Sequence, residues 1–199
     1  MGLSILIADD HPLFRMGLRY ALEAAGFQII GEAASGAEAI QKSQALIPQV
    51  LLLDIKMPEG DGIEVTRQLR KSFNSEALII ILLSTFEEEA ILHAAREAGA
   101  SAFFSKETDP KTLAEAIRKI SQDPQKDWLP QVDLPELSSR ELEVLYLLAE
   151  GQSNKAIAQN IGLSPETIKS HITNLYLKLE VNDRVSAVKR ASELGLLRL

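Results

Sequence analysis

The sequence predicts an α/β domain built on a five-stranded, doubly wound parallel sheet, followed by a small all-α domain. Two observations lead to this prediction. Five short apolar runs recur roughly every 22 to 29 residues with helical patterns between them, the spacing of repeated strand-helix units. After a proline-containing stretch, the remaining residues show only helical patterns. At 199 residues, the chain has room for two small domains.

The five apolar runs have the length and composition of buried parallel strands. The run at 77–83 is continuously apolar rather than alternating, as expected for a strand that is covered on both faces. All five are far shorter than the roughly 20 residues of a membrane-spanning helix. They occupy residues 3–7, 27–31, 50–53, 77–83 and 102–105.

The intervals between the runs carry helix signals. Pro12 begins the first helical pattern and Gly26 stops it. Asp109 and Pro110 form an N-cap and a first-turn proline for the last helix of this part. Right-handed crossovers then place helices on both faces of the sheet.

A linker at residues 122–136 separates a first domain at 1–121 from a second at 137–199. Three prolines break any helix in the linker, and its polar residues keep it solvated. Trp128 is the exception, and we expect it to dock on a neighbouring surface.

The tail contains short helices with clear end signals. Ser138 and Glu141 form a capping box at the start of its first helix. Two further helices are joined by a tight turn at Gly162, and Pro165 opens the second of them. A short helix, a glycine turn and a longer helix that is polar outside predict a helix-turn-helix.

Five polar residues follow four of the strand-like runs and form the first candidate site. The carboxyl ends of parallel strands meet at one sheet edge, where open α/β sheets bind ligands. A single acid at a strand end is more often a helix cap than a catalytic residue. Polar residues that recur at four strand ends are much less easily explained by chance, which favours a functional site. The residues are Asp9, Asp10, Asp54, Ser84 and Lys106.

This residue set suits a divalent cation and a phosphoryl group. Asp54 is the predicted nucleophile, because a carboxylate can form an acyl phosphate with only a metal to assist it. Lys106 is expected to pair with one phosphoryl oxygen and the Ser84 hydroxyl to donate to another. Mg²⁺ prefers oxygen ligands. The predicted ligands are Asp9, Asp10, Asp54 and the backbone carbonyl of Lys56.

The outward face of the longer tail helix forms the second candidate site, a DNA-binding surface. Lys169 can donate to guanine, while Ser170 and Thr173 can make sequence-tolerant contacts or touch a thymine methyl. Other polar residues are better placed for phosphate contacts. The predicted contacts are Thr167, Lys169, Ser170, Thr173, Asn174, Lys178 and Arg184.

Composition limits the possible functions. The absence of cysteine excludes disulfides, thiolate metal sites and thiol nucleophiles. The net charge is −7, with 13 Lys+Arg against 20 Asp+Glu in residues 1–133 and 8 against 8 in residues 134–199. The overall negative charge counts mildly against DNA binding, although affinity follows local rather than total charge. Without a signal sequence or membrane-length run, an intracellular protein is expected.

Both parts carry specific motifs of one known family. The first part, over 3–121, resembles a receiver domain through Asp9-Asp10-His11, the segment 54–62, Leu83-Ser84-Thr85 and Lys106. The tail resembles a LuxR-type helix-turn-helix through the segments 137–141, 151–158 and 167–171. Together they resemble the NarL/FixJ response regulators of two-component systems over nearly the full length.

The resemblance implies a flavodoxin-like fold, a bacterial cytoplasmic location and a partner histidine kinase that phosphorylates Asp54. It also implies a switch in which Ser84 moves toward the phosphoryl group and Phe103 rotates into the vacated space. Since one such DNA-binding domain buries little surface, tight binding requires two copies on paired half-sites. We expect a homodimer on double-stranded DNA, formed through the apolar residues of the last helix.

Three other functions remain open from the residues. A Mg²⁺ phosphatase could use Asp54 as its nucleophile, but such enzymes need a second acid two residues later, where Lys56 stands. A regulator that works without phosphorylation is a second alternative. A signalling adaptor whose helical tail binds protein is the third, because the basic excess of the tail helices is small.

Overall fold

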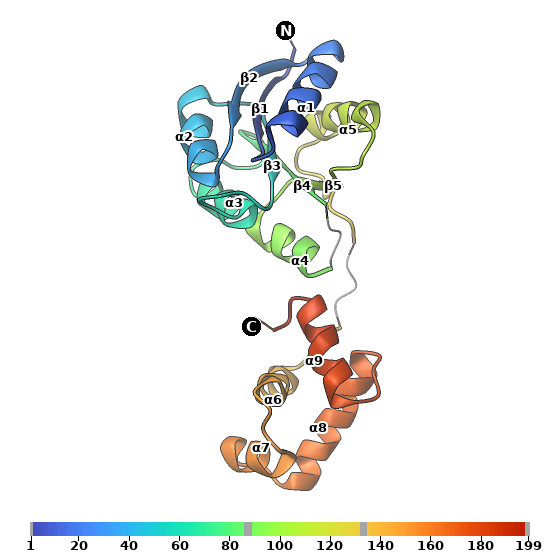
Figure 1. The fold of residues 1–199 in the computed structure, drawn as a ribbon. Coiled ribbons are helices and arrows are strands. Elements are labelled where there is room, and N and C mark those ends of the chain that lie inside the picture. The colour runs from blue at the N-terminus through green and yellow to red at the C-terminus, as the bar shows by residue number, and fades with distance from the viewer. Residues whose placement is uncertain (1, 86–88, 132–134, 198–199) are drawn as a thin grey trace. The chain divides into compact units, whose positions relative to one another are not determined.

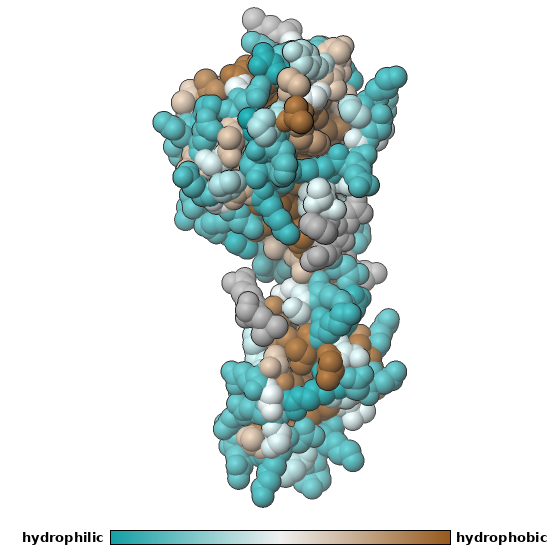
Figure 2. Space-filling model, viewed as in Figure 1, coloured by the Kyte–Doolittle hydropathy of each residue, from teal (hydrophilic) through white to brown (hydrophobic). Residues whose placement is uncertain are grey.

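The computed structural model describes residues 2–85, 89–131 and 135–197 (Figure 1). The chain divides into two compact units, of which the N-terminal one contains a β-sheet and the C-terminal one is helical. On the face shown in Figure 2, both units are largely hydrophilic, with apolar residues interspersed.

The sheet consists of five parallel strands in the order β2-β1-β3-β4-β5. Sequential strands lie on both sides of β1, so the strand order reverses between β1 and β3. This confirms the predicted doubly wound sheet. The strands are β1 Ser4–Ala8, β2 Gln28–Ala33, β3 Val50–Asp54, β4 Ile79–Ser84 and β5 Ala102–Ser105.

Helices cover both faces of the sheet, and of α4 only the part from Ala94 onward belongs to the N-terminal unit. Helix α1 packs against α5, and α2 against α3, on opposite sides of the sheet (Figure 1). The predicted cap of α5 is present, since the Asp109 carboxylate accepts hydrogen bonds from the backbone N–H groups of Lys111 and Thr112. The helices are α1 Pro12–Ala24, α2 Gly36–Leu46, α3 Gly62–Arg70, α4 Glu89–Ala98 and α5 Pro110–Gln122.

Burial explains why the strands are continuously apolar. Every residue of β3 and β4 is buried, because both strands lie inside the sheet with helices on each face. The edge strand β2 has only one fully buried residue, Ala33. Deep burial of the central strands therefore holds their polar last residues, Asp54 and Ser84, in fixed positions at the sheet edge.

The indole of Trp128 docks on the N-terminal unit, as expected. Trp128 forms an isolated bridge with Ala102, packs against the sheet core and donates its Nε1–H to the carbonyl oxygen of Asp123 at 3.0 Å. The neighbouring Leu129 is buried. The predicted domain boundaries at residues 121 and 137 stay a prediction.

The C-terminal unit contains helices with the predicted end signals. Both hydrogen bonds of the Ser138–Glu141 capping box are formed. Gly162 ends the second helix in the left-handed conformation, with φ 69°, where glycine has no Cβ to clash. Ile168 and Leu175 pack in the core of the unit. The helices are α6 Ser139–Ala149, α7 Asn154–Ile161, α8 Pro165–Lys178 and α9 Arg184–Glu193.

The apolar residues of the last helix, through which dimerisation was expected, divide into two groups. Ala191 and Leu194 are buried in the core of their own unit. Val188 is half-buried against the same core, whereas Val185 is 76% exposed. Most of this apolar surface therefore stabilises the single copy, whereas Val185 is exposed and available to a second one.

Candidate functional site

Four strand ends bring the predicted residues of the first site to one edge of the sheet. The Nζ of Lys106, just after β5, lies 2.8 Å from Oδ2 of Asp9 and 2.7 Å from Oδ2 of Asp54. Asp9 and Asp54 are 0% and 3% exposed. Three residues separated by 45 and 52 positions in the sequence thus form a buried ion triad.

A cluster of possible metal ligands shares two acids, Asp9 and Asp54, with this triad. Asp9, Asp10, His11 and Asp54 each offer one ligand atom, and these atoms all lie within 4.8 Å of one another. His11 Nδ1 lies 2.6 Å from Oδ1 of Asp10, and the His11 backbone N–H donates to Oδ1 of Asp9 at 2.8 Å. Carboxylate oxygens are the ligands that Mg²⁺ prefers, so the donor set fits this ion.

Burial and ion pairing have opposing effects on the pKa values of Asp54 and Lys106. Burial, with the neighbouring Asp9 charge, raises the pKa of Asp54 despite its contact with Lys106. Burial also disfavours the charged form of Lys106, but its ion pairs with Asp54 and Asp9 outweigh that effect and raise its pKa. One ammonium between two carboxylates leaves excess negative charge, which an added cation can neutralise.

The remaining predicted residues of this site lie on adjoining strands and loops. The Lys56 backbone N–H donates to Oδ1 of Asp54 at 3.4 Å. Ser84 is buried at the end of β4, and its carbonyl oxygen accepts from the Lys106 backbone N–H at 2.8 Å. Phe103 is buried in β5. The structure therefore places Ser84 beside the segment that carries Lys106, with Phe103 three residues before that lysine.

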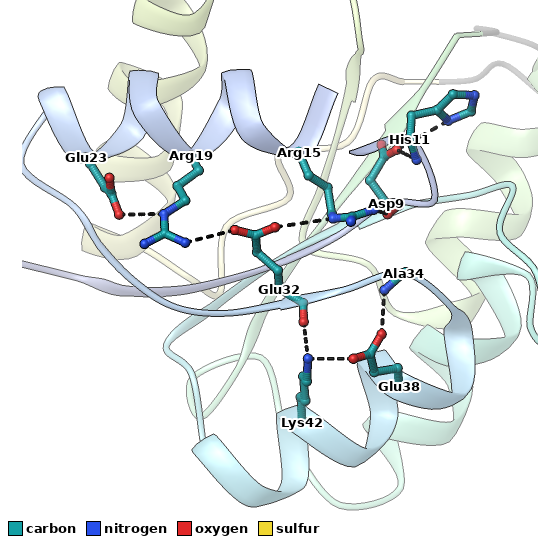
Figure 3. A network of polar contacts seen from close by, with 9 residues as sticks. All are labelled: Asp9, His11, Arg15, Arg19, Glu23, Glu32, Ala34, Glu38 and Lys42. Atoms are coloured by element: carbon teal, nitrogen blue, oxygen red, sulfur yellow. Dashed lines mark hydrogen bonds and ion pairs between the residues drawn. The ribbon is translucent and has the colours of Figure 1, made fainter. Parts of the chain in front are cut away.

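A polar network supports the loop that carries the acids, and sequence reasoning assigned it no role (Figure 3). Arg15 Nη1 donates to the carbonyl oxygen of Asp9 at 2.5 Å. Arg15 Nε lies 3.4 Å from Oε2 of Glu32, whose Oε1 accepts from Arg19 Nη1 at 3.1 Å. The network ties the start of α1 to β2. No pattern in the sequence indicated these contacts, because they join side chains of α1 to a residue of β2.

Gly62 and His11 are further residues to which no role was assigned. A Cβ on Gly62 would lie 2.4 Å from the carbonyl oxygen of Asp54, so glycine lets α3 begin close to that strand end. His11 could have been selected from the sequence, because imidazole is a common metal ligand and His11 directly follows two of the predicted acidic ligands.

The second candidate site lies on α8. Ile168, Ile172 and Leu175 face the core, as predicted. Before the last turn of the helix, five of the predicted DNA-contacting residues are exposed: Thr167, Lys169, Ser170, Thr173 and Asn174. A pocket of about 340 Å³ lies along this face and is lined by Glu166, Lys169, Ser170, Thr173 and Asn174.

The two other predicted contacts also hold the C-terminal unit together. Lys178 Nζ lies 2.7 Å from Oε2 of Glu141 and donates to the carbonyl oxygen of Glu136 at 2.8 Å. Arg184 donates to the carbonyl oxygens of Gln152 and Leu148, at 2.8 Å and 2.5 Å. A contact with DNA would have to share these cations with the protein's own acceptors, so their roles stay predictions.

Among the described residues, no helix combines the length and the apolar character needed to cross a membrane.

Comparisons with known proteins agree for both units. Residues 5–118 match the family model described as "Response regulator receiver domain", and residues 135–191 match "Bacterial regulatory proteins, luxR family". The response regulator protein VraR of Staphylococcus aureus is 34% identical over a 212-residue alignment, which covers 100% of both chains.

Solved structures show the same similarity. RcsB of Salmonella typhimurium aligns with a TM-score of 0.83 at 29% identity, covering 96% of this chain and 100% of that chain. An RcsB–DNA complex aligns with a TM-score of 0.71 at 29% identity, over 98% and 100% of the two chains. The receiver domain of the putative response regulator NarL from Mycobacterium tuberculosis gives 0.58 at 33% identity, over 61% and 98%.

Proposed function

The chain belongs to the response regulators of the NarL/FixJ family, and we propose that phosphorylation of its Asp54 by a histidine kinase controls DNA binding. Members of this family are transcription factors rather than enzymes. The observation that carries the proposal is the buried triad of Asp9, Asp54 and Lys106 at the edge of the sheet. The receiver domain is proposed to span 1–121, the linker 122–136 and the DNA-binding domain 137–199.

Asp54 is the proposed phosphoacceptor. One of its oxygens forms the new bond to phosphorus while the bond between phosphorus and the kinase histidine nitrogen breaks. Lys106, already 2.7 Å from Asp54, is positioned to neutralise a phosphoryl oxygen. The buried Ser84 hydroxyl is the proposed donor to a second oxygen. The triad thus supplies both the nucleophile and a fixed positive charge.

Mg²⁺ is the proposed cofactor, and Asp9, Asp10, Asp54 and the Lys56 carbonyl are its proposed ligands. When bound, the ion offsets negative charge on the carboxylates and the phosphoryl group. The acids that would hold it lie within 4.8 Å of one another. The Arg15 contact with the Asp9 carbonyl keeps the loop that carries them in position.

Ser84 and Phe103 are the proposed switch. Phosphorylation adds about −1.5 to −2 charges at the sheet edge, which draws the Ser84 hydroxyl toward the new group. The Phe103 ring then rotates into the space that Ser84 leaves, altering the surface around β4 and β5. Both side chains are buried. Their movement therefore requires the packed side chains around them to move as well.

Double-stranded DNA is the proposed target, bound by a homodimer in the bacterial cytoplasm. Solved structures of the related RcsB include dimers bound to DNA, which supports this assembly. Lys169, Ser170 and Thr173 are the proposed base contacts. The residues proposed to reach phosphates are Thr167, Asn174, Lys178 and Arg184.

A DNA-binding isotherm with and without a small phosphodonor plus Mg²⁺ tests the proposal. We expect severalfold tightening in the parent, equivalent to about 1–3 kcal/mol of coupling, and none in Asp54→Asn. Glu115→Gln, which changes an exposed acid on α5, serves as the control and should respond like the parent. Equal tightening in Asp54→Asn would instead support a regulator that works without phosphorylation, and binding that is insensitive to salt would support a protein-binding adaptor.

A further inference from the structure

We propose that Glu166 reads bases in the major groove and that α8 selects operators through hydrogen-bond acceptors around a single lysine. This inference rests on the proposed DNA binding and specifies which bases the helix recognises. The acceptors are the carboxylate of Glu166 and the hydroxyls of Ser170 and Thr173, and the lysine is Lys169.

The hydroxyl protons of α8 are already used within the helix. Ser170 Oγ donates to the carbonyl oxygen of Glu166 at 3.2 Å, and Thr173 Oγ1 donates to the carbonyl oxygen of Lys169 at 3.0 Å. A hydroxyl has one proton and two lone pairs, so while these bonds are formed each of these groups presents lone pairs to a ligand. The Glu166 carboxylate likewise accepts and does not donate when ionised.

The four residues form one continuous reading face. Positions 166, 169, 170 and 173 are three or four residues apart and lie on the same side of a helix. All four are exposed and line the same pocket. From residue 166 to residue 173 the helix rises about 10.5 Å, comparable to about three base pairs at roughly 3.4 Å each.

Glu166 lies at the end of α8 that reaches the bases in helix-turn-helix proteins. Their recognition helices contact base edges with N-terminal residues, and Glu166 is the second residue of α8. In the major groove, acceptors pair with the amino groups of cytosine and adenine, whereas lysine pairs with O6 and N7 of guanine. The half-site is therefore expected to combine a guanine with neighbouring cytosine or adenine amino groups.

A purely structural role for Glu166 makes a different prediction. An acid in the first turn of a helix offsets the helix dipole, and aspartate would do so equally well. Base reading also depends on reach, because Glu166→Asp keeps the charge but withdraws the carboxylate by one methylene. The pair Glu166→Ala and Glu166→Asp separates these roles, because alanine removes the acceptor and aspartate withdraws it, and only base reading predicts that both variants lose the same discrimination.

The experiment selects binding sites from a random duplex pool with the full-length chain, in the presence of Mg²⁺ and a phosphodonor. Dissociation constants are then measured on the selected duplex and on its single-base substitutions. In the parent, replacing the recognised cytosine or adenine should weaken binding roughly 5- to 150-fold. In Glu166→Ala and Glu166→Asp, this ratio should fall toward 1 at one position, while Glu166→Ala, which removes a negative charge, also binds random DNA more tightly.

Two further variants complete the test. Thr173→Val keeps the side-chain shape but removes the acceptor, and should lose discrimination at a different position. Glu150→Gln removes an exposed charge at the end of α6 and should retain the parent ratios. Unchanged ratios in both Glu166 variants, with helical content intact by circular dichroism, overturn the inference alone. Absence of binding to any duplex overturns the proposed DNA binding as well.

Discussion

Asp54→Asn is expected to stabilise the N-terminal unit in the absence of divalent cations. Asp54 is 3% exposed and shares Lys106 with a second buried acid, Asp9. At an effective dielectric constant of about 20, the Lys106 contact at 2.7 Å favours the ionised form by about 6 kcal/mol. Asp9, whose ligand atom lies within 4.8 Å, opposes it by at least about 3.5 kcal/mol. Charge alone therefore favours ionisation by at most roughly 2.5 kcal/mol.

Burial outweighs this electrostatic preference for the ionised carboxylate. Removing an ion from water costs several kcal/mol, and the pKa of Asp54 is raised, with burial as the main cause. A raised folded-state pKa means that the folded chain binds this proton more tightly than the unfolded chain. The stability that the group contributes is complete below the unfolded pKa near 4 and is lost as pH rises through the folded pKa. Above the folded-state pKa, the ionised carboxylate therefore weakens the fold.

The expected gain for Asp54→Asn is about 0.5–2 kcal/mol at pH 7.5 in EDTA, and it should shrink as pH falls toward 4. Urea unfolding followed by tryptophan fluorescence measures it, because Trp128 is the only tryptophan and packs on the sheet core. Glu115→Gln should stay within about 0.5 kcal/mol of the parent. A loss of stability at pH 7.5 would refute the reasoning, since the ion pair with Lys106 would then outweigh burial.

Two further substitutions test the packing and capping of each unit. Leu52→Ala, at a fully buried position of β3, should cost about 2–5 kcal/mol in urea unfolding followed by Trp128 fluorescence; a cost below 1 kcal/mol would contradict the rigid central core. Ser138→Ala removes one side of the capping box and should lower the stability of the C-terminal unit by about 0.5–2 kcal/mol in thermal melts by circular dichroism. An unchanged melt would mean that Glu141, held by Lys178, caps α6 without the serine.

The sheet and the first site could be predicted because local patterns encode them. Continuous apolar runs identify buried strands, and parallel strands place the residues after them at one edge. Asp9, Asp54 and Lys106 therefore met as expected, although 97 residues separate the first from the last. The capping box at Ser138 and the left-handed turn at Gly162 were predictable for the same reason, since each depends only on adjacent residues.

Contacts between distant side chains could not be predicted in this way. Lys178 and Arg184 looked like free cations in the sequence, but the structure joins Lys178 to Glu141 and Arg184 to the carbonyls near the end of α6. Arg15 and Glu32 carried no signal of the network that holds the Asp9 loop. Leu194 looked available to a second copy, yet it completes its own core.

The sequence by itself determined the strands, the helix ends and the edge at which the acids and the lysine gather. The tertiary structure alone decided which charges are neutralised within the protein and which remain available to a ligand. The physical reason is that backbone periodicity and capping act within a few residues. Burial and ion pairing depend instead on side chains that only the folded chain brings within a few ångströms of each other.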